Sequence, residues 1–229
     1  MGFGSNLQFL RKMYDGMTQE RLAEKIGVSR QTISKWEMEL SFPEMEKAIS
    51  LCNLFNCSLD ELLRGNVNTD DDAYTNLRIE TINSFHYFMY AVISENPEKD
   101  AKDHVHNWAV ANHIKDSKII GWNFPFVSQE QVNVYHMHGY AAACMLQEKF
   151  ESNLPGIGFQ NTYRYAVITI RDPFRNPFVL IPNAYRTLSR YMEVNQFHCI
   201  EDHKALSCFE WEYKIGEVIH MDIYLAIEA

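Results

Sequence analysis

The chain has 229 residues, of which 46% are hydrophobic and 22% are charged, as is typical of a folded globular protein. This composition excludes a wholly disordered chain, and no apolar run approaches the roughly 18 residues that cross a bilayer. The N-terminal sequence lacks the apolar core of a secretory signal. The five cysteines are therefore expected to be reduced thiols of a cytoplasmic protein rather than disulfides.

Charged and aromatic residues divide the sequence into two parts. Residues 1–65 hold 8 Lys and Arg against 9 Asp and Glu, whereas residues 66–229 hold 13 against 21. The second part also contains 24 of the 30 Phe, Tyr and Trp residues. The net charge of −9 argues against a basic nucleic-acid coat protein, but it does not prevent DNA recognition by one local face. The sequence therefore predicts a nearly neutral head and an acidic, aromatic-rich body.

The head is predicted to be all-α, with five short helices. Apolar residues recur at helical spacing, and Thr18 and Ser29 each stand where they can cap a helix. A very short turn at Gly27 joins the second and third helices, which is the helix-turn-helix arrangement. We expect the helices near residues 7–14, 19–26, 30–39, 43–55 and 58–63.

The outer face of the third predicted helix carries side chains that are suited to DNA. Arg can pair with guanine and Gln with adenine, whereas Thr, Ser and Lys suit phosphates or thymine methyl groups. Gln19, at the start of the second predicted helix, is placed to donate to a phosphate or to brace Gln31. The candidate DNA-binding residues are Gln19, Arg30, Gln31, Thr32, Ser34 and Lys35.

The head resembles the Cro and lambda-repressor type of helix-turn-helix domain, also called the XRE family, in the stretch MTQERLAEKIGVSRQTISKWE and in the later SLDELL. The resemblance covers residues 5–65. It implies a homodimer that binds a palindromic double-stranded DNA operator, with half-sites about one helical turn apart. It also favours a repressor over an activator. A small helical bundle that binds protein is the alternative.

Residues 66–76 are predicted to be a linker between the head and the body. The segment GNVNTDDDAYTN, which begins at residue 65, is rich in Asn and Asp and contains one Val. A surface loop inside one domain is the alternative interpretation.

The pattern of the body, residues 77–229, changes to strands and two helices, which predicts an α+β fold. Strand, helix, strand, strand occurs twice in this order, so we expect a duplicated unit. Two such units would form one antiparallel sheet with both helices on one face and a ligand groove. The strands are expected near residues 78–94, 118–126, 131–146, 162–170, 206–213 and 218–227, and the helices near 97–113 and 182–194.

The body resembles the gyrase-inhibitor-like family, also known as the AraC-type effector-binding domain, in the segments YAVITIRDPFRNPFVLIPNAYRTLSRYMEVNQ, CFEWEY and MDIYLAIE. The resemblance implies a groove whose Glu pairs with cationic or polar drug-like ligands, and this residue is Glu210 here. The sequence departs from the family pattern where Asp172 and Gln196 replace Gly and where Ala226 replaces Pro. Glu212 stands where the family has Tyr.

A carboxylate among aromatic rings attracts cations by Coulomb and cation–π interactions. Glu212 lies two residues after Glu210, so the two share one face of their strand. The candidate ligand-binding residues are Glu210, Glu212, Trp211, Tyr213, Trp122, Phe124, Tyr135, Tyr165 and Tyr90. Each aromatic residue could instead belong to the core, and both carboxylates could be solubility residues of an edge strand.

No catalytic residue, cofactor or metal site is expected. The sequence contains no nucleophile elbow, phosphate loop or Rossmann glycine pattern, and its His and Cys residues match no zinc spacing. The sequence thus predicts a ligand-responsive transcriptional repressor whose body binds a small amphipathic molecule, either cationic or neutral. The alternatives are a hydrolase that uses a groove Glu as a base, and a module that sequesters a protein partner.

Overall fold

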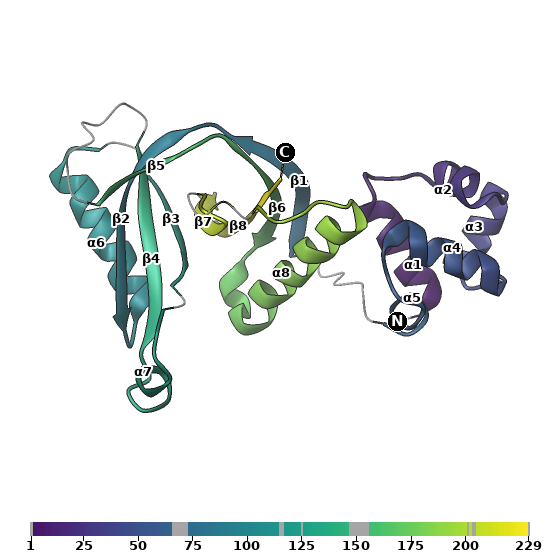
Figure 1. The fold of residues 1–229 in the computed structure, drawn as a ribbon, viewed down its shortest axis with the longest axis horizontal. Helices are drawn as coiled ribbons and strands as arrows, with labels where there is room; N and C mark the ends of the chain where they lie inside the picture. The colour runs from purple at the N-terminus through teal and green to yellow at the C-terminus, as the bar shows by residue number, and fades with distance from the viewer. Residues whose placement is uncertain are drawn as a thin grey trace. The chain divides into compact units, whose positions relative to one another are not determined.

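The computed structural model describes residues 2–65, 73–114, 117–124, 126–146, 156–200, 202 and 205–228. The chain divides into two compact units, residues 1–72 with 182–198, and residues 73–181 with 199–229. The first unit contains the head, and the second contains a curled antiparallel sheet (Figure 1). Among the described helices, none is long and apolar enough to span a bilayer.

The head consists of short helices whose ends are fixed by local sequence. The Thr18 hydroxyl accepts a hydrogen bond from the Arg21 amide, and the Ser29 hydroxyl accepts one from the Thr32 amide. Gly27 closes the second helix with φ of +71°, a conformation that favours glycine. The helices are α1 (Phe3–Met13), α2 (Gln19–Ile26), α3 (Arg30–Glu37), α4 (Met45–Phe55) and α5 (Leu59–Leu63).

The ends of α1 and α4 differ from the sequence-based expectation. Helix α1 begins at Phe3 because this buried ring extends the apolar stripe of Leu7 and Leu10 by one turn. Helix α4 begins at Met45 rather than at Pro43, after Glu44 in an extended conformation. These differences lengthen α1 and shorten α4.

A buried polar contact joins the two ends of the head. Asn6 is fully buried, and its amide nitrogen donates to the carbonyls of Glu61, Leu62 and Gly65 at 3.3, 3.2 and 2.7 Å. Leu62 belongs to the last turn of α5, where carbonyls lack partners inside the helix, and Gly65 follows that turn. The Asn6 side chain therefore ties α1 to the end of α5.

Residues 182–198 belong to the same unit as the head. The Asn195 amide nitrogen donates to the Met13 carbonyl at 3.0 Å, and the Arg190 guanidinium forms an ion pair with Glu61. The helix α8 (Pro177–Val194) begins five residues earlier than expected, so Pro182 lies inside it. The two compact units thus divide the chain within α8, and the assignment of residues 77–229 to one body stays a prediction.

The body is built on an eight-stranded antiparallel sheet in the order β1-β6-β8-β7-β3-β4-β2-β5. Strands β3 and β7 meet at the centre, where Ile120 pairs with Trp211 and Gly121 pairs with Glu210. The strands are β1 (Tyr74–Ile82), β2 (Phe85–Ser94), β3 (Lys118–Asn123), β4 (His138–Leu146), β5 (Ile157–Gln160), β6 (Tyr163–Arg171), β7 (Cys208–Ile215) and β8 (Val218–Ile227). The other helices of this unit are α6 (Pro97–Ala111), α7 (Gln129–Asn133) and the short 3-10 helix η1 (Pro173–Arg175).

Several boundaries in the body differ from the prediction. The strand expected over 78–94 is two strands, β1 and β2, and the first part of 131–146 forms α7 because Ser128 and Gln131 make a capping box. Strand β5 was not predicted. Residues 74–76 start β1 although the sequence placed them in a linker, and residues 66–72 of that linker lie outside the described residues.

The sheet buries side chains on both faces. On one face, α6 packs against β2, β3 and β4 (Figure 1), and Trp108 stacks on Phe88 with ring centroids 4.0 Å apart. On the opposite face, Tyr165, Phe209 and Tyr224 form an aromatic core. The expected placement of both helices on one face stays a prediction, because residues 182–198 of α8 belong to the other unit.

Gly121 allows the Tyr140 ring to approach β3 closely. A Cβ atom at residue 121 would lie 2.6 Å from the Cε1 atom of Tyr140. Tyr140 is only 5% exposed, so its ring has little room to move away. Replacing Gly121 with Ala is therefore expected to lower the free energy of unfolding by about 1–3 kcal/mol, as overpacked cores do. Urea denaturation measures this change. When Tyr140→Leu is also present, Gly121→Ala should cost less free energy of unfolding than it does alone. If the free-energy changes of the two substitutions simply added, this packing would be contradicted.

Candidate functional site

A buried ion pair fixes the position of α3 in the head. The Arg11 Nε and Nη2 atoms donate to the two carboxylate oxygens of Glu37 at 2.6 and 3.0 Å. The side chains are only 10% and 3% exposed, and Arg11 also donates to the Met17 carbonyl at 2.6 Å. The amide nitrogen of Gln19 donates to Glu37 at 2.9 Å. Glu37 at the end of α3 is therefore bonded to side chains of α1 and α2.

The outer face of α3 presents polar side chains to solvent. A shallow hollow of about 290 Å³ lies among Arg30, Gln31, Ser34, Lys35, Met38 and Leu40. Arg30 pairs with Glu20 at 2.6 Å, but both side chains are more than half exposed. Because such surface pairs contribute little free energy, Arg30 can exchange Glu20 for another acceptor.

The structure brings together four of the six candidate DNA-binding residues. Arg30, Gln31, Ser34 and Lys35 share the hollow. The other two make contacts within the head, since the Thr32 hydroxyl bonds the Ser29 hydroxyl at 2.9 Å and Gln19 is held by Glu37. The bracing contact expected between Gln19 and Gln31 is thus made to Glu37 instead.

Sequence reasoning missed two apolar residues at the edge of this hollow. Met38 and Leu40 are 59% and 71% exposed. The sequence predicted helix up to residue 39, but α3 ends at Glu37. The early end of α3 places both side chains beside the polar face rather than against the core.

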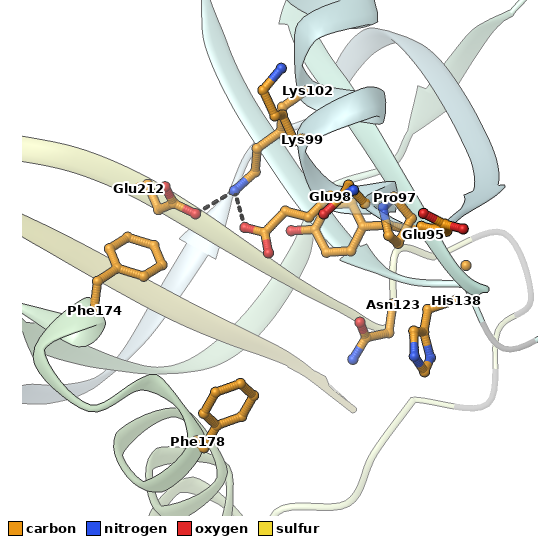
Figure 2. Close-up of a pocket in the computed structure, with 13 residues that line it drawn as sticks. Glu95, Pro97, Glu98, Lys99, Lys102, Asn123, His138, Phe174, Phe178 and Glu212 are labelled. Carbon is orange, nitrogen blue, oxygen red and sulfur yellow. Dashed lines mark hydrogen bonds and ion pairs between the residues drawn. The ribbon is translucent and has the colours of Figure 1, made fainter. Parts of the chain in front are cut away.

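A cavity of about 770 Å³ opens in the body, on the face of the sheet that α6 covers (Figure 2). It lies between the start of α6 and the segment of η1 and early α8, with β3, β4 and β7 contributing to its lining. The lining residues are Glu95, Asn96, Pro97, Glu98, Lys99, Lys102, Asn123, His138, Gly139, Tyr140, Phe174, Phe178 and Glu212.

Lys102 is the polar centre of this cavity. Its ammonium donates to Glu98 at 2.7 Å and forms an ion pair with Glu212, as the dashed lines in Figure 2 mark. The ammonium also lies 5.7 Å from the centroid of the Tyr140 ring. Burial alone would lower the pKa of Lys102, but the hydrogen bonds and charges of Glu212 and Glu98 raise it above its usual value. Lys102 is therefore a charged ammonium at neutral pH.

The rings of Tyr140, Phe174 and Phe178 also line the cavity. Phe174 is 43% exposed and Phe178 is 91% exposed, and both stand opposite Lys102 in Figure 2. The hydroxyl of Tyr140 is buried and has no hydrogen-bond partner among the described residues. Burial and the nearby carboxylate of Glu210 raise the pKa of Tyr140, so its hydroxyl stays protonated. The cavity thus combines charged groups with uncovered apolar surface.

The candidate ligand-binding residues of β7 divide between the two faces of the sheet. Glu212 lines the cavity, and Glu210 lies on the same face because the two are two residues apart. Trp211 and Tyr213 point to the opposite face, where they stack with centroids 4.5 Å apart. The ammonium nitrogen of Lys118 lies over the Trp211 ring, 3.7 Å from the ring centroid. Strand alternation therefore separates the two carboxylates from these two rings.

The remaining candidate aromatic residues also lie outside the cavity lining. Tyr165 is fully buried, and Trp122 packs against the same aromatic core. The Tyr90 ring stacks on the ring of His104 in α6, with centroids 3.7 Å apart. The ring centroids of Phe124 and Phe126 lie 5.3 Å apart. Tyr135 follows α7 in the chain, and its side chain is 53% exposed.

Several lining residues were missed by the sequence reasoning. Lys102 lies in a helix that was predicted, but nothing local shows that it reaches β7. Phe174 and Phe178 lie in the segment DPFRNPF, which carried the resemblance of the body. Within the described part of the chain, no three His, Cys, Asp or Glu side chains come together as a metal site.

Comparison with protein families identifies the head as a helix-turn-helix domain, since residues 10–62 match the family model described as "Helix-turn-helix". Over 65 residues the chain is 45% identical to the HTH-type transcriptional activator BcrR of Enterococcus faecalis, which covers 28% of this chain and 31% of that protein. It is 33% identical over 66 residues to the uncharacterized HTH-type transcriptional regulator YqaE of Bacillus subtilis (strain 168), covering 29% of this chain and 56% of that protein. The matches thus span about a third to about half of these relatives, which are named as transcriptional regulators.

Among the solved structures that are similar to the chain, one covers about a third of it and another covers almost all of it. The crystal structure of the P22 c2 repressor in complex with a synthetic operator has 32% identity and a TM-score of 0.28, covering 29% of this chain and 98% of that chain. The cryo-EM structure of an EcmrR–DNA complex has 14% identity and a TM-score of 0.47, covering 96% of this chain and 80% of that chain.

Proposed function

We propose that the chain is a cytoplasmic, ligand-responsive transcriptional repressor, with a DNA-binding head at 1–65, a linker that begins at residue 66, and an effector-binding body whose first strand, β1, begins at Tyr74. The observation that carries DNA binding is the row of Arg30, Gln31, Ser34 and Lys35 on the outer face of a helix fixed by Glu37. Arg30 and Gln31 read base edges in the major groove, and Ser34 and Lys35 bind phosphates. Thr32 and Gln19 support this face.

The operator is a palindrome that binds a homodimer. Two heads related by a two-fold axis present two copies of α3 to half-sites about one helical turn apart. Selection of DNA from a random pool by the purified full chain tests this directly. We expect enrichment of inverted half-sites whose centres are about 10 base pairs apart. Recovery of unrelated sequences after repeated rounds would contradict sequence-specific DNA binding.

The body is a gyrase-inhibitor-like effector-binding domain made of a duplicated unit. The strand order supports the duplication, because β3-β4-β2 and β7-β8-β6 run outward in matching order from the centre of the sheet. Each set is interrupted by one helix, α6 in the first and α8 in the second. Both halves therefore repeat strand, helix, strand, strand.

The effector is a small amphipathic cation. The cavity is lined by three carboxylates, Glu95, Glu98 and Glu212, against two ammonium groups, Lys99 and Lys102. Its aromatic rings provide apolar contact and favour a cation further. A volume of about 770 Å³ is in the range of cavities that hold drug-sized molecules.

Replacing Glu212 with Gln is expected to weaken the binding of a cationic dye by about 10-fold, because a half-buried carboxylate loses its charge. Fluorescence polarisation of rhodamine 6G, a cationic xanthene, measures this change, and fluorescein serves as its anionic counterpart. Glu217→Gln, in the exposed turn between β7 and β8, is the matched control. Equal dye affinity of the Glu212→Gln variant and the unchanged chain would contradict the role of Glu212.

A further inference from the structure

We propose that Lys102 is a displaceable internal cation, whose ammonium occupies the position that the cationic group of the effector takes. The proposal rests on the proposed effector function and adds to it the residue that sets affinity and charge selectivity. Lys102 already makes the two kinds of contact that such an effector would make. Its ammonium pairs with the Glu212 carboxylate and lies 5.7 Å from the Tyr140 ring centroid.

The two carboxylates that hold Lys102 differ in how they are attached. Glu98 lies one turn earlier on the same helix, α6, and is 49% exposed. Glu212 comes from β7 and is 28% exposed. If the Lys102 side chain swings toward solvent, it can keep Glu98 as a partner because both side chains belong to one helix. Displacement therefore breaks one ion pair, between Lys102 and Glu212, and leaves the other intact.

The position of Lys102 also explains which molecules can enter. A cation replaces the lost partner of Glu212, so the carboxylate is never left alone in the cavity. A neutral aromatic molecule of the same size provides no such replacement, and an anion would meet Glu95, Glu98 and Glu212. Exchange of one cation for another thus selects cationic effectors and at the same time limits how tightly they bind.

Lys99 offers a matched control on the same helix. It also lines the cavity, but its ammonium bonds to Asp103 at 2.6 Å rather than to Glu212. Its side chain is 75% exposed, compared with 25% for Lys102. Removing either lysine changes the net charge of the chain by the same amount, so only a local role of Lys102 distinguishes the two variants.

The test compares Lys102→Met and Lys99→Met in the full chain, with rhodamine 6G as the probe. We expect Lys102→Met to bind the dye about 10-fold more tightly or better, since the dye no longer has to displace an ammonium. Lys99→Met should gain clearly less affinity for rhodamine 6G than Lys102→Met, because the exposed Lys99 ammonium is screened by water and ions. Neither substitution should raise the affinity for fluorescein by a comparable factor. Lys102→Gln, which keeps a polar side chain, should behave like Lys102→Met, and thermal denaturation verifies that each variant is folded.

Each outcome separates this inference from the proposed function. If rhodamine 6G binds the unchanged chain and Glu212→Gln weakens it, but Lys102→Met and Lys102→Gln bind no more tightly, the inference is wrong and the effector site stands. An equal gain in Lys99→Met would also overturn it, because net charge alone would then explain the gain. If the dye binds neither the unchanged chain nor the Lys102 variants, both proposals fail.

Discussion

Replacing both Arg30 and Gln31 with Ala is expected to weaken binding to the selected operator by about 100-fold or more. Each good bidentate contact between a side chain and a base contributes about 1–3 kcal/mol to sequence discrimination. Both residues are exposed, and the ion pair between Arg30 and Glu20 lies on the surface. The double variant should therefore keep the stability of the head while losing its specific contacts with DNA.

Fluorescence anisotropy with labelled operator measures this loss, and a scrambled DNA of equal length reports non-specific affinity. Gln8→Ala is the control, because Gln8 is an exposed glutamine of α1 outside the hollow of α3. We expect Gln8→Ala to bind the operator like the unchanged chain. An Arg30→Ala and Gln31→Ala double variant that retained operator affinity would show that another surface reads the DNA.

Replacing Arg11 with Ala is expected to lower the free energy of unfolding of the head by about 3–5 kcal/mol. The substitution leaves the Glu37 carboxylate, which is only 3% exposed, without its cationic partner. Breaking one side of a buried ion pair costs this much because the remaining charge stays out of water. The loss is large compared with the total stability of a small domain.

Urea denaturation followed by circular dichroism measures this effect. Replacing both members, as Arg11→Met with Glu37→Leu, should recover much of the lost stability, since apolar side chains of similar volume often substitute well for a buried ion pair. If Arg11→Ala unfolded at the same urea concentration as the unchanged chain, the contact between Arg11 and Glu37 could not be what holds α3 in place.

Much of the head could be predicted from its sequence because its structure depends on local signals. Thr18, Ser29 and Ser58 mark helix starts, and each accepts the capping hydrogen bond in the structure. Contacts between residues far apart in the chain left no such signal. Neither the bonds from Asn6 to the end of α5 nor the pairing of Arg11 with Glu37 could be inferred from spacing.

The cavity of the body was predictable only in part. The alternation of β7 places Glu210 and Glu212 on one face, as expected, but the same rule places Trp211 and Tyr213 on the other. The other walls come from α6, β4, η1 and α8, and the sequence does not show which of these segments meet. Lys102 therefore became visible as the partner of Glu212 only in the structure.

The measurement that tests the central claim most directly is the operator affinity of the full chain with and without saturating rhodamine 6G. We expect the dye to change this affinity by about 5-fold or more, the lower end of typical allosteric coupling. Glu212→Gln should require more dye for the same change. Unaltered operator affinity at a dye concentration that fills the cavity would contradict a ligand-responsive regulator, even if DNA and dye each bind.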